Sequence, residues 1–186
     1  MLHIGAHYGQ ESKFYEELGV KVIWFEALPE NYEMLLYNIR NFPNQIAMMA
    51  LLGKQNIDNV KFNIANNNGA SSSIYSFGKN VSVKNLKMVN SVQLPMKRLD
   101  YILRKEQVLE YNHWIIDVQG AELSVCIGAG NLLNYVNSIE IEVSTREEYV
   151  DGSNYEELKY FLSNYGFYPL WEPKKDSHED ILFLKK

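Results

Sequence analysis

The residues best suited to hold a ligand stand just after the first two apolar segments of the chain. Gly5 and Gly9 flank a short turn after residues 2–4, and Glu26 follows the apolar residues 20–25. A glycine turn between a strand and a helix lets the backbone come close to a ligand. A carboxylate at the tip of the neighbouring strand can accept hydrogen bonds from both hydroxyls of a ribose. This pairing indicates a bound nucleoside cofactor.

The spacing of the turn narrows the choice of cofactor. A dinucleotide site requires the pattern G-x-G-x-x-G, so that a pyrophosphate sits on the helix N-terminus. Here His7 and Gln10 occupy two of the positions that this pattern reserves for glycine. The turn therefore favours a nucleoside without phosphates, S-adenosylmethionine, with its amino-acid part over the glycines. In the alternative interpretation the glycines only form a tight turn, and Glu26 is a solvated strand end.

A second polar group, residues 117–122, lies at the end of an apolar run over 114–118. Ligands bind at the carboxyl ends of strands in open α/β sheets, so this group should lie near the first glycine turn. A hydroxyl that accepts a methyl group profits from a general base. Asp117, Glu122 and His7 are the candidates, with Asp117 first. The alternative is a carboxylate that only positions the cofactor or a loop.

The elements that must position these groups alternate between strand and helix. Short apolar runs predict buried parallel strands, and apolar residues at helical spacing predict helices. We expect strand 2–4, helix 10–18 with Phe14, Tyr15 and Leu18 on one side, strand 20–25, helix 30–41 and buried strand 46–52. An inserted excursion should follow, with strands at 60–65 and 74–77 around a polar turn at 66–73. That turn is either a flexible surface loop or a loop that faces the ligand.

The second half of the chain continues the same alternation. We expect a helix start at residue 98, strand 114–118, helix 123–133, strand 138–143, a helix from 155 to its stop at Gly166, and antiparallel strands 167–172 and 180–184. Ser153 to Glu156 form the pattern of a capping box for the last helix. With no internal repeat, the pattern predicts one α/β domain over residues 1–186.

Composition restricts the classes of partner. The chain has 186 residues and a formal net charge of −5, which gives no strong electrostatic hold on nucleic acid phosphates. No apolar run approaches the roughly 18 residues of a membrane-spanning helix, and the N-terminus lacks the order of a signal peptide. A cytoplasmic location is the default expectation. Cys126 is the single cysteine, and its apolar neighbours favour a buried structural thiol.

Several carboxylates and histidines of the chain are possible metal ligands. Asp117 and Glu122, with Glu140 and Glu142 on one strand face, offer the oxygen ligands that Mg²⁺ prefers. Alternating Glu residues in a strand are more often a solvated or hydrogen-bonded face, so we expect no metal. His113 and His178 are expected to flank strands at the surface, which leaves His7 as the histidine of functional interest.

Taken in order, these motifs resemble the FkbM family of S-adenosylmethionine-dependent methyltransferases. The residues that carry the resemblance, over nearly the whole chain, are residues 5–11, Phe25-Glu26, 71–73, 98–100, 117–122, 128–129 and the segment 155–166 before a closing hairpin. The resemblance implies a class I methyltransferase fold, a Rossmann-like three-layer sandwich. Its mostly parallel seven-stranded sheet ends in an antiparallel C-terminal hairpin.

The resemblance also assigns binding residues. Gly5, Ala6, His7 and Gly9 are expected at the amino-acid end of the cofactor, Glu26 with Ala27 at the ribose, and Ala50 and Leu51 at the adenine. Ser72 and the group Asp117, Gln119 and Gly120 would face the cofactor or the acceptor. Two features depart from the family pattern. His3 stands where the first strand commonly has Asp, and the chain starts directly at that strand, which suggests a minimal domain or a shortened N-terminus.

The function that follows is S-adenosylmethionine-dependent O-methylation of a small-molecule or glycan hydroxyl, with the acceptor class taken from the resemblance. Two alternatives stay open. A nucleotide-dependent oxidoreductase would need a different glycine pattern. A catalytically degenerate module that binds the cofactor without turnover would account for His3 and the abrupt N-terminus. RNA methylation is disfavoured by the acidic balance of the chain.

Overall fold

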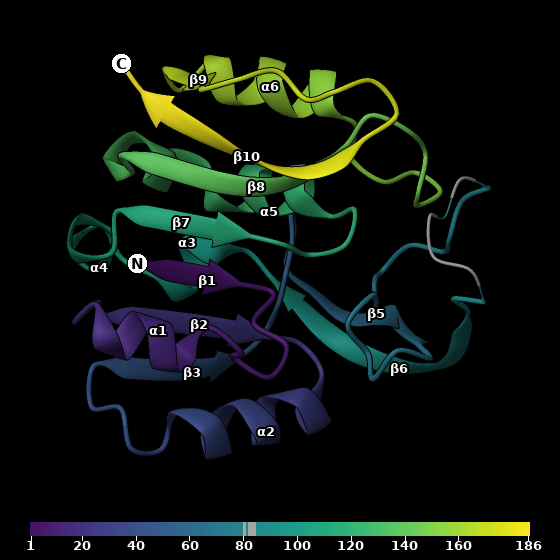
Figure 1. Cartoon of the computed structure of the whole chain (residues 1–186), viewed down its shortest axis with the longest axis horizontal. Coiled ribbons are helices and arrows are strands. Elements are labelled where there is room, and N and C mark those ends of the chain that lie inside the picture. Colours follow the sequence, from purple (N-terminus) through teal and green to yellow (C-terminus); the bar gives the residue numbers. More distant parts are fainter. Residues whose placement is uncertain (80, 82–84) are drawn as a thin grey trace.

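The computed structural model describes residues 1–79, 81 and 85–186. Its centre is a seven-stranded sheet in the order β3-β2-β1-β7-β8-β10-β9 (Figure 1). The strands of this sheet are β1 (Leu2–Ile4), β2 (Val22–Glu26), β3 (Gln45–Met49), β7 (His113–Ile116), β8 (Ser138–Ser144), β9 (Phe167–Pro169) and β10 (His178–Lys185). The predicted class of fold is confirmed.

The direction of the chain changes beside β1. From β1 the chain moves outward through β2 to β3 and then returns to β7 on the other side of β1. The pairs β1–β2, β2–β3, β1–β7 and β7–β8 are parallel, whereas β10 is antiparallel to both of its neighbours. The carboxyl ends of β1, β2 and β7 therefore meet where the strand order reverses, which is the usual place for a ligand in such sheets.

Helices cover both faces of the sheet. On one face, α1 (Ser12–Glu17) and α2 (Pro29–Ile39) pack on a cluster around Trp24. The other face carries α3 (Leu99–Ile102), α4 (Lys105–Glu110), α5 (Glu122–Ala129), the 3-10 helix η1 (Gly130–Tyr135) and α6 (Tyr155–Ser163) over the largest core cluster. Cys126 is buried there, as predicted. Among the described residues, no helix is long and apolar enough to cross a membrane.

A small second sheet lies beyond the carboxyl ends of the central strands (Figure 1). It consists of β4 (Leu51–Leu52), β6 (Met88–Lys97) and β5 (Ile57–Ala65), in that order. Its core joins Phe62 and Met96 to Leu28, which follows the end of β2. This contact fixes the small sheet against the edge where the ligand site is expected.

Two predicted strands were wrong for topological reasons. Residues 46–52 are not one buried strand, because the chain leaves the main sheet at Ala50 and its next residues pair in the small sheet. Ile46 and Met49 are 54% and 56% exposed because β3 is an edge strand. Residues 74–77 form no strand, only a bridge from Phe77 to Tyr149. The partner of β5 is β6, which includes the residues expected to lead into a helix.

Helix boundaries also differ from the expected ones. In α1, Phe14 and Leu18 point outward and Tyr15 alone of the three is buried, because only one side of this short helix faces Trp24. Asn154 caps α6 by accepting a hydrogen bond from the Glu157 N–H, so Ser153 is not the cap. The helix after Glu122 becomes a 3-10 helix at Gly130, where φ is +51°.

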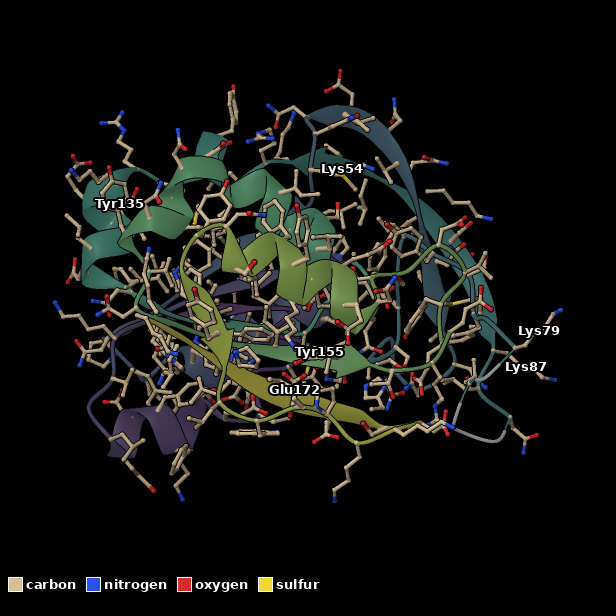
Figure 2. The ribbon with its side chains drawn as sticks, turned by 90° about the horizontal axis from the view of Figure 1, so that it is seen from above. Lys54, Lys79, Lys87, Tyr135, Tyr155 and Glu172 are labelled. Carbon is tan, nitrogen blue, oxygen red and sulfur yellow. The ribbon has the colours of Figure 1, made fainter. Side chains whose placement is uncertain are left out.

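The C-terminal hairpin is tied to the last helix. The Tyr155 hydroxyl of α6 donates to Glu172 at 2.6 Å, and the Lys159 ammonium group lies 2.5 Å from the same carboxylate. Figure 2 shows Tyr155 and Glu172 beside each other. Glu172 lies in the connection between β9 and β10 rather than in a strand, so this expected strand is shorter than predicted. The helix thereby holds the start of β10 in place.

Candidate active site

A cavity of about 200 Å³ opens at the carboxyl ends of β1, β2 and β7. Most of the predicted binding residues line it: Gly5, Ala6, His7, Glu26, Ala27, Ala50, Leu51, Ser72, Asp117 and Gln119. His3 lines it as well. Burial lowers the pKa of His3 to about 4, and the ring stacks on Trp24 with centroids 4.7 Å apart. His3 is therefore a neutral wall of the cavity where an acidic residue was expected.

Glu26 is a buried and oriented carboxylate. Its two oxygens accept backbone hydrogen bonds from His7 N–H and Leu28 N–H, both at 2.8 Å. Burial raises the pKa of Glu26 to about 7, although these backbone N–H groups oppose the rise. The side chain is only 7% exposed, so it is not the solvated strand end of the alternative interpretation. Its orientation leaves acceptor capacity for hydroxyl groups in the cavity.

The two glycines of the turn are required for packing. A Cβ atom on Gly5, which has φ +91°, would lie 1.7 Å from the Asp117 carbonyl oxygen. A Cβ atom on Gly9, which has φ +65°, would lie 2.5 Å from Leu35 Cδ1. Gly5 thus allows the ends of β1 and β7 to approach each other. Gly9 packs on α2 and does not line the cavity.

His7 links the glycine turn to the polar loop 66–73. Its Nδ1 lies 2.8 Å from Gln10 Nε2, and its Nε2 lies 3.0 Å from the Asn68 carbonyl oxygen. Because the amide of Gln10 donates to Nδ1, the proton of the ring is on Nε2 and points at Asn68. Both ring nitrogens are therefore engaged, which does not suit the predicted base. Gly69 and Ala70 of this loop line the cavity, so the loop faces the cavity.

Asp117 and Gln119 form the centre of the second polar group. Gln119 Nε2 donates to Asp117 Oδ1 at 2.6 Å and to Glu142 Oε2 at 2.8 Å. The amide oxygen of Gln119 accepts from the Tyr149 hydroxyl at 2.6 Å. Burial and the neighbouring Glu142 carboxylate raise the pKa of Asp117 well above its usual range. The structure thus brings together a pair of carboxylates that share one amide donor.

Glu122 bonds to the backbone of the loop that follows β7. Its Oε1 accepts from Val118 N–H at 3.1 Å and from Gly120 N–H at 3.0 Å, which holds the loop between β7 and α5. Burial raises the pKa of Glu122 to about 7. Glu122 and Gly120 lie outside the first cavity and line a separate hollow of about 600 Å³. These contacts favour the alternative of a carboxylate that positions the loop.

A further cavity of about 520 Å³ adjoins the first and shares Ala70, Asp117 and Gln119 with it. Sequence reasoning missed several of its lining residues: Phe77, Glu142, Arg146, Glu148, Tyr149 and His178. His178 begins β10 with its side chain 27% exposed, and its ring nitrogens lie 2.5 Å from Glu142 Oε1 and 2.8 Å from Glu148 Oε2, contacts that were not predicted. His113 is half-buried against Ser138. Only the strand-end position of Glu142 was a signal in the sequence.

Oxygens of Asp117, Glu122 and Glu142 come within 4.8 Å of one another. Carboxylates at such distances are able to hold a divalent cation. Here Glu122 accepts from two backbone N–H groups, and the other two carboxylates accept from Gln119. Glu140 does not belong to this group. The chain's own donors thus meet one oxygen of Asp117 and one of Glu122, and both oxygens of Glu142.

A sheet in this order, with a ligand cavity at its reversal point, defines the class I methyltransferases. The fold is similar to that of fibrillarin from Aeropyrum pernix, solved with natively bound S-adenosyl-L-methionine (TM-score 0.53, 11% identity, 98% of this chain and 65% of that chain). It is also similar to magnesium protoporphyrin IX methyltransferase (ChlM) from Synechocystis PCC 6803 with bound SAH (TM-score 0.53, 8% identity, 100% of this chain and 73% of that chain). These likenesses show the fold.

The chain belongs to the Methyltransferase FkbM domain family, whose sequence model matches residues 3–169. A search among curated proteins finds no match. Family and fold together place the chain among the S-adenosylmethionine-dependent methyltransferases. The predicted family, fold and cofactor are confirmed, and the alternative of a nucleotide-dependent oxidoreductase has no support.

Proposed function

We propose that the chain transfers a methyl group from S-adenosylmethionine to a hydroxyl of a small molecule or a glycan. The observation that carries this proposal is the position of Asp117, which lines both the cofactor cavity and the adjoining cavity. A carboxylate at such a junction is within reach of an acceptor that enters from the second cavity. O-methylation is therefore favoured by the presence of an acid–base group where the acceptor oxygen would lie.

The first cavity has groups that suit each part of the cofactor. Glu26 would accept hydrogen bonds from the ribose hydroxyls. Leu51, Phe62 and Ile74 give an apolar wall for the adenine, and Ala6 with the adjacent backbone would hold the amino-acid part. The bound cofactor supplies an electrophilic methyl group on a sulfonium. Gly5 serves this part of the cavity by letting the ends of β1 and β7 approach each other, since a Cβ atom there would meet the Asp117 carbonyl oxygen.

Methyl transfer to oxygen depends mainly on orientation. The acceptor oxygen must be held about 3 Å from the methyl carbon in line with the bond that breaks, and this positioning supplies much of the acceleration. As the oxygen–carbon bond forms, the acceptor hydroxyl loses its proton. We assign Asp117 as the carboxylate that takes this proton, and Gln119 as the residue that orients Asp117. His7 and Glu122 are assigned to positioning.

The test is release of S-adenosylhomocysteine in the presence of a panel of hydroxyl compounds, with free sugars, glycosides and phenols as separate groups. We expect at least one group of compounds to raise the release of S-adenosylhomocysteine above the level measured without an acceptor. Asp117→Asn should lower kcat at least about a hundredfold, the usual contribution of a general base. Cofactor binding without release for any group would contradict O-methylation and favour a module without turnover.

A further inference from the structure

His178 lines the cavity of about 520 Å³ that adjoins the cofactor cavity, which we call the acceptor-side cavity. It belongs to β10, the strand next to β8 (Figure 1). It stands at the start of β10, where its backbone pairs with Ser144. Its Nε2 is 2.5 Å from Glu142 Oε1, and its Nδ1 is 2.8 Å from Glu148 Oε2. A carboxylate oxygen only accepts, so a ring that bonds two carboxylates must donate from both nitrogens. With both carboxylates ionised, this geometry requires an imidazolium.

The contacts continue from His178 to the cofactor cavity. Glu142 accepts from His178 with one oxygen and from Gln119 Nε2 with the other, at 2.8 Å. The same amide nitrogen donates to Asp117 at 2.6 Å. Gln119 has a left-handed conformation, φ +56°; its backbone carbonyl accepts from the Ser73 hydroxyl, and its side-chain oxygen accepts from the Tyr149 hydroxyl. A continuous chain of contacts therefore joins β10 to the carboxylate at the cavity.

We infer that His178 is a positioning residue of the methyl-transfer site, which acts through Glu142 and Gln119 on the orientation and the negative charge that Asp117 presents to the cofactor cavity. The inference rests on the proposed placement of the cofactor in that cavity. It does not depend on which acceptor the enzyme methylates.

The charges around His178 come from several elements. Glu142 of β8 and Glu148 of the following loop contact the ring directly, and Arg146 Nε lies 3.1 Å from the other oxygen of Glu148. Asp180 pairs with Glu142 in the β8–β10 ladder, and Asp117, Glu122 and Tyr149 are the other titratable groups that the described residues place beside Glu142. Hydrogen bonding to Glu142 raises the pKa of His178 to about 9 despite its burial. The cation therefore persists at neutral pH.

The cation matters because the cofactor and its product differ in charge. S-adenosylmethionine carries a positive sulfonium, whereas the sulfur of S-adenosylhomocysteine is neutral. Negative charge on Asp117 and Glu142 favours the sulfonium over the thioether. Without the His178 cation, two adjacent buried carboxylates hold a proton more tightly. Loss of His178 should therefore weaken the preference for S-adenosylmethionine, and a purely structural role would weaken both ligands alike.

The test compares calorimetric Kd values of both ligands for the full chain, His178→Asn and His178→Lys near neutral pH. We expect His178→Asn to lower the ratio of Kd for S-adenosylhomocysteine to Kd for S-adenosylmethionine by about fivefold, equivalent to somewhat less than one pKa unit. His178→Lys should restore most of the ratio because it restores the cation. An unchanged ratio in His178→Asn, or no restoration by lysine, would overturn the inference.

Two further measurements keep the test decisive. If His178→Asn does not fold, Glu148→Gln serves instead, with an expected fall of about twofold because it removes one of the two charges that hold the imidazolium. Nitrogen NMR of the histidine rings should show both nitrogens of His178 protonated at neutral pH, and a neutral ring would contradict the inference. Failure of the wild type to bind S-adenosylmethionine would overturn the cofactor placement as well, whereas normal binding with an unchanged ratio overturns the role of His178 alone.

Discussion

The contacts of Glu26 and Gly5 explain why one position carries a carboxylate and the other carries no side chain. Glu26 is oriented by two backbone N–H groups and is nearly inaccessible to solvent, so it is prepared to accept from a ligand. Gly5 has no room for a side chain because the Asp117 carbonyl group occupies that space. The first residue serves binding directly, and the second permits the strands that form the cavity to meet.

Gly5 and Gly19 form a matched pair for a stability experiment. Both have positive φ, +91° and +66°, but a Cβ atom on Gly19 would have nothing within 4 Å. Gly19→Ala should cost about 1 kcal/mol from backbone strain alone. Gly5→Ala should cost more than about 3 kcal/mol, because the backbone of β7 must also move. Urea denaturation measures both, and equal losses would contradict the packing role of Gly5.

At the scale of elements, the antiparallel hairpin contributes to the site as well as to the sheet. β10 brings His178 beside Glu142 of β8, and the loop that follows β8 brings Glu148 to the same ring. The small sheet supplies Phe62 to the cofactor cavity and fixes the cavity-facing loop 66–73 through the bridge from Asn63 to Ser73. The two cavities thus depend on elements far apart in sequence.

The ion pairs of His178 predict a pH-dependent stability. The pKa of this histidine is raised from 6.5 to about 9. Its stabilising contribution is therefore fully present below pH 6.5 and is lost as the pH rises through 9. The free energy of unfolding should be larger for the wild type than for His178→Asn. This difference should be about 2 kcal/mol greater at low pH than at high pH. Urea denaturation near pH 6 and pH 9.5 measures this difference, and a pH-independent difference would contradict the ion pairs.

How far the sequence predicts this structure depends on the range of the interactions. The turn after β1, Glu26 at the end of β2 and Asp117 after β7 follow from local pattern and chain direction, and they were predicted. The departure of the chain at Ala50 depends on pairing with β6, more than 40 residues later in the chain. The placement of His178 depends on the register between β8 and β10. Neither feature has a local signal in the sequence, which is why neither was predicted.

The charge of the whole molecule bears on the acceptor that we propose. The formal charge of −5 and the carboxylates of the acceptor-side cavity disfavour a polyanion. We therefore expect no binding of a single-stranded RNA even at low salt, where electrostatic attraction is greatest. Fluorescence anisotropy with a labelled oligonucleotide measures this. Salt-dependent binding would contradict a neutral small-molecule or glycan acceptor.

We predict that the cavity at the carboxyl ends of β1, β2 and β7 binds S-adenosylmethionine through Glu26. Calorimetric titration of the cofactor into wild type and Glu26→Gln tests it most directly. We predict binding by the wild type and at least about tenfold weaker binding by the variant, since lost hydrogen bonds to a charged acceptor cost about 1.5–3 kcal/mol. Equal binding by a folded Glu26→Gln, or no binding by the wild type, would contradict the account.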